Sequence, residues 1–356
     1  MLDFITEPIS VWERLKETDK PILLYGMGNG ADKILAELDR REIPCAGVFA
    51  SDGFVRGHSF HDFQVMSYSQ AKERFGDAVI LLAFAVYRPE MLEWMNQLNG
   101  QHEFYAPDVP VIGEKPFSSD DLQTHAQEIQ CVYDLLADEE SKRVFSGVLN
   151  FKLSGKIRYL NEVTSSVDEA YRTLLCPQRG ERYLDLGAYN GDTVREFIGY
   201  QPDYREIIAF EPDEKNFRKL TNWLKQEEIR DCMAYCRAVW SEPTLLPFQK
   251  KAGRNSALGE GGTATVEADS IDHLLNGEPI DLIKMDVEGA EAEAIQGGAQ
   301  TLQRYMPKLN IALYHRNEDI FRLPLLICKI NPSYRLYLRH HPYIPAWETN
   351  LYAIKP

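Results

Sequence analysis

Residues Tyr183–Thr193, with the sequence YLDLGAYNGDT, decide the fold of this chain. An apolar strand leads into a turn with Gly187 and Gly191, and a helix is predicted to begin near Asp192 or Thr193. Glycines in such a turn let the backbone approach a ligand closely, and the first N–H groups of a helix lack partners within it. The stretch therefore indicates a corner that binds a small molecule. The alternative is an ordinary corner capped by Asp192.

Two carboxylates indicate which small molecule binds there. Glu211 stands at the end of the next strand, twenty residues beyond Gly191, where an acid accepts hydrogen bonds from ribose hydroxyls. Asp185 lies just before the glycine turn, where its charge would repel a pyrophosphate and attract the ammonium group of a methionine. The pair favours an aminoacyl nucleoside such as S-adenosylmethionine over a dinucleotide.

A second acidic stretch is KMDVEGAE, residues Lys284–Glu291, at the end of another predicted strand. In an open parallel sheet, ligands bind outside the carboxyl ends of the strands, so Asp286 is expected beside Asp185 and Glu211. Three acids in six residues suit a general base, a set of divalent-cation ligands or the acidic first turn of a helix. We favour a function for Asp286 and Glu288, and a place on the helix surface for Glu291.

Histidines follow two later strands. His315 comes at the end of NIALYH, where it could take a proton from a substrate hydroxyl or simply close the strand. His340 and His341 are adjacent in a strand and so point to opposite faces, which makes them a weak metal pair. The six cysteines include no CxxC pair, so structural zinc is not expected, and no metal ligands are assigned.

The pattern along the chain predicts an α/β fold with two alternating blocks. Strands and helices alternate over residues 20–110 and again from Arg182, where about seven strands end in an antiparallel pair. A helical stretch separates the blocks. In the first block, Gly26–Ala31 fits G-x-G-x-x-G/A, with Asp52 after the next strand. That loop suits a nucleotide or sugar-nucleotide pocket, or else its glycines serve packing.

Composition limits the classes of partner. The 356 residues carry a formal charge of −15, which disfavours binding to nucleic acid or to an anionic membrane surface. No apolar run is long enough to span a membrane, and the first residues include acids where a signal peptide has basic residues. With its scattered cysteines, the chain is expected to be cytoplasmic.

Five motifs in order resemble the FkbM family of S-adenosylmethionine-dependent methyltransferases. They span about residues 176–356 and read YLDLGAYNGDT, AFEPDEKNF, IKMDVEGAE, ALYHRNEDI and YRLYLRHH followed by ETNLYA. The resemblance implies a class I methyltransferase fold, a seven-stranded, mostly parallel doubly wound sheet with the last strand antiparallel. It also implies methyl transfer to a hydroxyl of a sugar, glycolipid or related natural product. The domains expected are a small Rossmann-like domain (1–112), a helical connector (113–175) and the methyltransferase domain (176–356).

Carried onto this sequence, the resemblance assigns site residues. The methionine side would be lined by Asp185, Gly187, Tyr189 and Asn190, the ribose held by Glu211, and the adenine placed near Asp213 and Phe217. Tyr189 stands where the wider class has a third glycine, so the path of the turn is open. The full cofactor-binding set is Asp185, Gly187, Ala188, Tyr189, Asn190, Gly191, Asp192, Glu211, Pro212, Asp213 and Phe217.

The reaction expected is displacement at the sulfonium methyl group by an acceptor hydroxyl. Asp286 and His315 are the predicted bases, with Glu288 as an orienting residue or metal partner. An anionic acceptor would need basic residues such as Lys284, Arg316 or Arg339.

Two other functions stay open at this point. One is a nucleotide-sugar binding or sensing protein with an inactive methyltransferase domain. The other is an NAD-dependent oxidoreductase, which is disfavoured because no acid–base pair accompanies the Gly26–Ala31 loop. The acceptor is expected to be a small molecule or carbohydrate, and self-association of the chain is left open.

Overall fold

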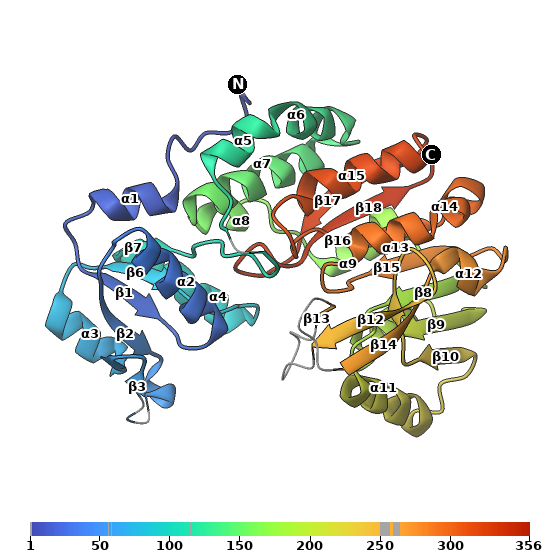
Figure 1. The fold of residues 1–356 in the computed structure, drawn as a ribbon, viewed down its shortest axis with the longest axis horizontal. Coiled ribbons are helices and arrows are strands. Elements are labelled where there is room, and N and C mark those ends of the chain that lie inside the picture. Colours follow the sequence, from blue (N-terminus) through green and yellow to red (C-terminus); the bar gives the residue numbers. More distant parts are fainter. Residues whose placement is uncertain (1, 56, 58, 114, 250–256, 259–263) are drawn as a thin grey trace. The chain divides into compact units, whose positions relative to one another are not determined.

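The computed structural model describes residues 2–55, 57, 59–113, 115–249, 257–258 and 264–356 (Figure 1). The chain forms two compact units. The first comprises residues 1–130, 142–164 and 340–348, and the second comprises residues 131–141, 165–339 and 349–356. None of the helices in the described ranges is long and apolar enough to cross a membrane.

The first unit is built on a five-stranded parallel sheet in the order β5-β2-β1-β6-β7. Its strands are β1 (Ile22–Tyr25), β2 (Cys45–Ala50), β5 (Met66–Ser67), β6 (Val79–Leu82) and β7 (Glu103–Tyr105). The helices that connect them are α2 (Asn29–Arg40), α3 (Tyr68–Phe75) and α4 (Pro89–Gln101). The remaining elements are α1 (Val11–Glu17), a 3-10 turn (Asp52–Phe54) and the hairpin of β3 (Ser59–Phe60) and β4 (Phe63–Gln64). Strands β1 and β6 are apolar and buried throughout, as expected for a sheet covered on both faces.

The segment predicted as a connector is mainly helical. It contains α5 (Ser119–Thr124), α6 (Ala126–Leu135), α7 (Glu139–Ser154), α8 (Arg158–Asn161), α9 (Val167–Ala170) and a π-helical segment (Tyr171–Leu175). The chain passes from one unit to the other within α6 and α7 and again before α9. The predicted domain boundaries at residues 112 and 175 stay a prediction.

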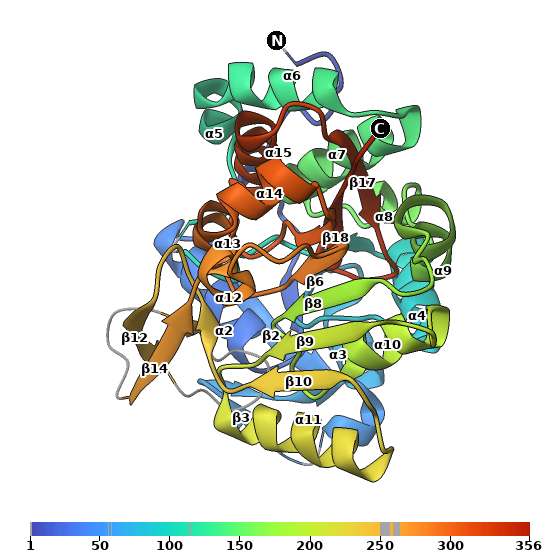
Figure 2. The ribbon, with the colours of Figure 1, turned by 90° about the vertical axis from the view of Figure 1, so that its right-hand side faces the viewer.

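The second unit is built on a seven-stranded sheet in the order β10-β9-β8-β15-β16-β18-β17. Figure 2 shows three of these strands, β10, β9 and β8, next to one another. Its strands are β8 (Arg182–Leu186), β9 (Glu206–Phe210), β10 (Cys232–Tyr235), β15 (Leu282–Met285), β16 (Lys308–Ala312), β17 (Arg335–His340) and β18 (Thr349–Ile354). The strands from β10 to β16 pair in parallel, and β18 pairs antiparallel with β16. The prediction of an α/β fold with parallel sheets is confirmed.

Helices alternate with these strands. They are α10 (Asp192–Tyr200), α11 (Glu214–Gln226), α12 (Ile271–Leu275), α13 (Glu291–Gly297), α14 (Ala299–Tyr305) and α15 (Asp319–Ile330). Helices α10 and α11 bury Phe197 and Leu220 in a cluster with Tyr183 of β8 and Ile207 of β9. Because consecutive strand residues alternate between the two faces, this cluster covers one face of the sheet. The loops that follow β8, β9, β15 and β16 all leave the sheet at its carboxyl edge.

A second, smaller sheet joins this unit between β10 and β15. It has the order β11-β14-β12-β13, with strands β11 (Ala238–Val239), β12 (Thr244–Gln249), β13 (Ala257–Leu258) and β14 (Ala264–Asp269). The antiparallel pair of β12 and β14 is its main element. Between β12 and β14, the structure describes residues 257–258.

Candidate active site

The first loop of the site joins β8 to α10. Asp185 lies inside β8 and is fully buried, and its Oδ2 accepts a hydrogen bond from the hydroxyl of Thr193. The other oxygen, Oδ1, is buried, and no group of the described residues forms a hydrogen bond with it. Burial raises the pKa of Asp185 to about 6, although the charge of Lys284 on the neighbouring strand opposes this shift. Thr193 therefore binds one oxygen of this carboxylate, and the other oxygen can still accept a hydrogen bond.

The turn after Asp185 requires its glycine. Gly187 has φ +89°, and a Cβ placed there would lie 1.9 Å from the carbonyl oxygen of Asp286. Tyr189 has φ +46°, so it adopts the left-handed conformation that glycine takes most easily. The sequence left the path of this turn open, and the structure shows that Tyr189 continues it in the left-handed conformation.

Helix α10 begins at Asp192, as predicted, but its N-cap is Gly191, which supplies no side chain. Asp192 is therefore not the capping residue, and ligand binding at this corner stays a prediction. The carboxylate of Asp192 accepts a hydrogen bond from the adjacent N–H of Thr193, and its side chain is exposed. Ala188 is buried, and Asn190 is half-buried.

Glu211 connects the first loop to the second, which follows β9. Its Oε2 accepts a hydrogen bond from the N–H of Tyr189 at 2.9 Å, and its Oε1 accepts one from the N–H of Asp213 at 2.8 Å. The side chain is buried, and this burial raises the pKa of Glu211 to about 7 in spite of the two N–H donors. One carboxylate thus fixes the two loops that were predicted to hold a nucleoside.

The other residues predicted on the second loop have separate positions. Asp213 is the N-cap of α11, since its Oδ1 accepts hydrogen bonds from the N–H groups of Lys215 and Asn216. Pro212 and Phe217 are half-buried, with Phe217 in the first turns of α11. The roles of these three residues at an adenine stay predictions.

The third loop follows β15 and carries Asp286 and Glu288. Asp286 accepts a hydrogen bond from the hydroxyl of Tyr314 at 2.8 Å, and its Oδ2 lies 3.5 Å from Nζ of Lys284. Its N–H donates to the carbonyl of Leu186, so this loop lies against the first one. Burial alone would raise the pKa of Asp286, but the cations Lys284 and His315 outweigh it and lower the pKa below its ordinary value.

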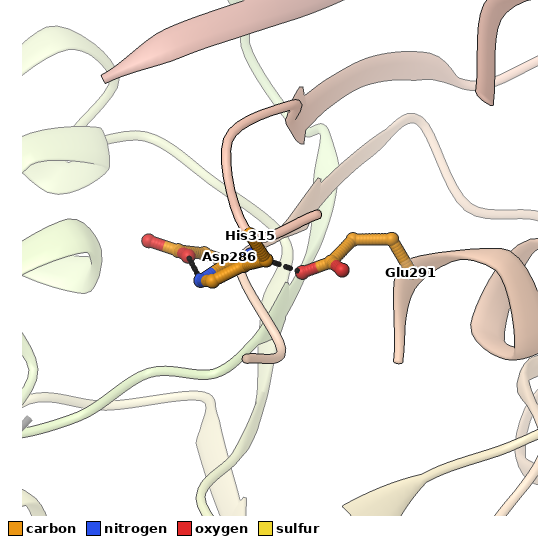
Figure 3. Close-up of side chains that lie close together, drawn as sticks. All are labelled: Asp286, Glu291 and His315. Carbon is orange, nitrogen blue, oxygen red and sulfur yellow. Dashed lines mark ion pairs between the residues drawn. The ribbon is translucent and has the colours of Figure 1, made fainter. Parts of the chain in front are cut away.

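His315, at the end of β16, lies between carboxylates. Figure 3 shows its ring between Asp286 on one side and Glu291 on the other. Nε2 lies 3.5 Å from Oδ1 of Asp286 and 3.5 Å from Oε2 of Glu288, and Nδ1 lies 3.0 Å from Oε1 of Glu291. Burial disfavours the charged ring, but these three carboxylates outweigh it and raise the pKa of His315 to about 10.

The position of Glu291 corrects the sequence analysis. It was expected on the helix surface, yet its side chain is 1% exposed and forms an ion pair with His315. Helix α13 begins at Glu291, so the residue does lie in an acidic first turn, but that turn faces inward. Glu291 is buried because it pairs with His315, which follows the next strand. The spacing of residues within α13 does not reveal this contact.

Asp286, Glu291 and His315 together offer the donor types of a divalent-metal site. In the arrangement present, however, the two ring nitrogens of His315 face different carboxylates. A single ion contacts only one of these nitrogens. The cluster therefore has the geometry of an ion-paired imidazole.

Several other predicted features lie apart from this cluster. Arg339 is buried and paired with Asp138 and Glu140, so it is not available to an anionic acceptor. His340 is buried, and its Nε2 lies 3.1 Å from the carbonyl oxygen of Tyr343. Burial lowers the pKa of His340 to about 3, which suits a neutral core residue.

Two glycines of the Gly26–Ala31 loop lie where a side chain would clash. A Cβ on Gly26 would lie 2.4 Å from the ring of Phe84, and one on Gly30 would lie 2.4 Å from the carbonyl oxygen of Ala83. Close packing of α2 against the end of β6 therefore accounts for two glycines of the loop. Gly28 has φ +120° and open space around its Cα.

The fold and the three loops first define a class. The chain is an α/β protein with a seven-stranded, mostly parallel sheet, and the three loops lie at the carboxyl edge of that sheet. A crystal structure of a methyltransferase FkbM from Methylobacillus flagellatus is 21% identical, covers 99% of this chain and 95% of its own, and has a TM-score of 0.75, which shows a shared fold. Residues 185–345 match the family model described as the Methyltransferase FkbM domain. This part of the chain is therefore a methyltransferase FkbM domain.

Other solved structures are similar over about half of the chain. A rRNA methylase from Streptococcus thermophilus is 15% identical, covers 53% of this chain and 92% of its own, and has a TM-score of 0.34. A fibrillarin from Aeropyrum pernix, in complex with S-adenosyl-L-methionine, is 13% identical and has a TM-score of 0.32. It covers 50% of this chain and 67% of its own. No curated protein sequence was found to match this chain.

Proposed function

We propose that the chain is an S-adenosylmethionine-dependent methyltransferase that acts on a hydroxyl of a sugar, glycolipid or related natural product. The observation that carries the proposal is the position of Glu211, which joins two loops at the carboxyl edge of the sheet. A third loop, with Asp286, lies against the first. The seven-stranded order, with β18 antiparallel, supports a class I methyltransferase fold.

The residues present fit S-adenosylmethionine. Oδ1 of Asp185 is a buried carboxylate oxygen without a donor, which is costly unless a ligand group such as an ammonium supplies one. Each oxygen of Glu211 accepts one backbone hydrogen bond and keeps capacity to accept another from a ribose hydroxyl. The charge of Asp185 at the glycine turn would repel a pyrophosphate. When bound, S-adenosylmethionine supplies a methyl group on a positively charged sulfur.

The proton of the acceptor hydroxyl goes to Asp286 in this proposal. With a pKa near 10, His315 already carries a proton at neutral pH and cannot accept another. Asp286 keeps its charge, and its side chain is 27% exposed, so an acceptor can reach it. His315 and Lys284 hold this carboxylate in place from within the protein.

The function is tested by methyl transfer from isotope-labelled S-adenosylmethionine to a panel of sugars, glycolipids and hydroxylated natural products. We expect incorporation into an acceptor, and a loss of about 100-fold or more in turnover with Asp286→Asn, because general-base contributions have this size. The exposed Glu227→Gln serves as a control. Transfer to no hydroxyl, or full turnover in Asp286→Asn, would contradict the proposal.

The pH dependence separates the two predicted bases. With Asp286 as the base, turnover at saturating cofactor stays level between pH 7 and pH 9, because a carboxylate of lowered pKa is fully charged throughout this range. With His315 as the base, turnover would climb towards pH 10, as the ring loses its proton. Measuring kcat across this range in the wild-type protein decides between them.

A further inference from the structure

Glu291 makes contacts in two directions from the first turn of α13. Its Oε1 accepts hydrogen bonds from the N–H of Val287 at 2.9 Å and from the N–H of Gly289 at 3.4 Å. The same oxygen lies 3.0 Å from Nδ1 of His315. Both side chains of this ion pair are 1% exposed. A single buried oxygen therefore contacts both the loop after β15 and the histidine after β16.

The loop that Glu291 holds carries the two acids of the site. Asp286 precedes Val287. Glu288 lies between Val287 and Gly289, whose N–H groups donate hydrogen bonds to Glu291. Glu288 has φ +53°, a strained conformation for a residue with a side chain, which needs support from its surroundings. The contact with Glu291 supplies that support on both sides of Glu288.

On the other side, the ion pair fixes the ring of His315. With Nδ1 next to Glu291, Nε2 is left facing Asp286 and Glu288 at 3.5 Å each. The Nδ1 atom has no well-directed hydrogen bond, so charge attraction carries the contact. If His315 moved away, Glu291 would keep a buried charge without a partner. Loss of this ion pair is therefore strongly unfavourable.

We propose that Glu291 is the positioning residue of this site, which orients His315 and fixes the loop that presents Asp286 and Glu288 to the acceptor. The catalytic part of this proposal rests on the proposed function, whereas the orientation of His315 does not. Glu291 touches no acceptor itself, because it lies behind His315 as seen from Asp286 (Figure 3).

The charged groups around His315 come from several parts of the chain. They are Glu291 on α13, Asp286 and Glu288 on the loop after β15, and Asp319 at the start of α15. Lys284 on β15 faces Asp286, and Arg316 follows His315 directly in the chain. Burial and the charge of Glu291 raise the pKa of Asp319 to about 7. Removal of the Glu291 charge should therefore lower the pKa of both groups, which favours the neutral ring of His315 and the charged carboxylate of Asp319.

The test is Glu291→Gln, which keeps an oxygen for the two N–H groups and removes the charge. The protein is labelled with ¹³C in its histidine rings, and the His315 signal is assigned with His315→Gln. We expect the pKa of His315 to fall by about one unit or more, and kcat to fall about tenfold or more with an unchanged KM for S-adenosylmethionine. Glu293→Gln, two residues further along α13, is the matched control and should change neither value.

The titration is informative even in the unsubstituted protein and without any cofactor. If His315 in the wild-type protein is neutral at pH 7, the ion pair is absent and the proposal is overturned, whether or not Glu291→Gln folds. An unchanged His315 titration in a folded Glu291→Gln protein would also overturn it. Neither result depends on methyl transfer, so a failure here is distinct from a failure of the proposed function.

Discussion

Glu211 and Glu291 perform similar tasks on neighbouring loops. Each is a buried carboxylate that accepts hydrogen bonds from two backbone N–H groups. Glu211 could be predicted as a site residue, because an acid after the second strand of such a sheet has a known place. Glu291 could not, because its burial depends on His315, which arrives 24 residues later in the chain. The spacing of residues in the sequence predicts a helix turn, but it does not predict which strand end that turn contacts.

Gly187 gives the sharpest prediction for a single residue. Gly187→Ala should lower the free energy of unfolding by about 2–4 kcal/mol, from left-handed strain and from the clash with the carbonyl of Asp286. Gly199→Ala is the matched control, since Gly199 lies in α10 with open space around its Cα. That change should stabilise the protein by up to about 1 kcal/mol. Equal effects of the two changes in chemical denaturation would show that the turn does not need its glycine.

At the scale of elements, the loops are positioned by strand ends and helix starts. The alternation of apolar strands and amphipathic helices sufficed to predict the sheet around β8, β9 and β15. It did not reveal the small sheet of β11–β14, because β12 contains the exposed Leu245 and a proline. Short strands with exposed apolar residues resemble loops in sequence, and their pairing is decided by partners some distance away.

The start of α11 carries a prediction at this scale. Asp213→Ala should cost about 1 kcal/mol of stability, because the capping oxygen for Lys215 and Asn216 is lost. It should also weaken binding of S-adenosylmethionine, because the loop held by Glu211 is displaced. Ser67→Ala removes the cap of α3 in the first unit at a similar cost in stability, and binding should stay unchanged. A loss of binding in Ser67→Ala but not in Asp213→Ala would contradict this account.

At the scale of the whole molecule, the sequence predicted a cofactor site in the second unit but did not reveal how the chain divides into units. Residues 340–348 belong to the first unit, although they lie between two strands of the second. The helices before α9 are likewise divided between the units. The assignment of these segments to a unit depends on contacts between residues far apart in the chain. Hydrophobic periodicity describes only short windows of sequence, so it does not predict such contacts. The motifs of the second unit were readable because they lie in single loops at one sheet edge.

Calorimetric titration tests whether the second unit binds S-adenosylmethionine through Glu211. The wild-type protein should bind S-adenosylmethionine and S-adenosylhomocysteine, and Glu211→Gln should weaken both by about tenfold or more, as for a buried charged acceptor. Glu227→Gln, which is exposed, should bind as the wild type does. NAD should not bind, because Asp185 at the glycine turn repels its pyrophosphate. Folded, ligand-free protein that binds neither sulfur compound, or that binds them equally well in Glu211→Gln, would contradict the claim.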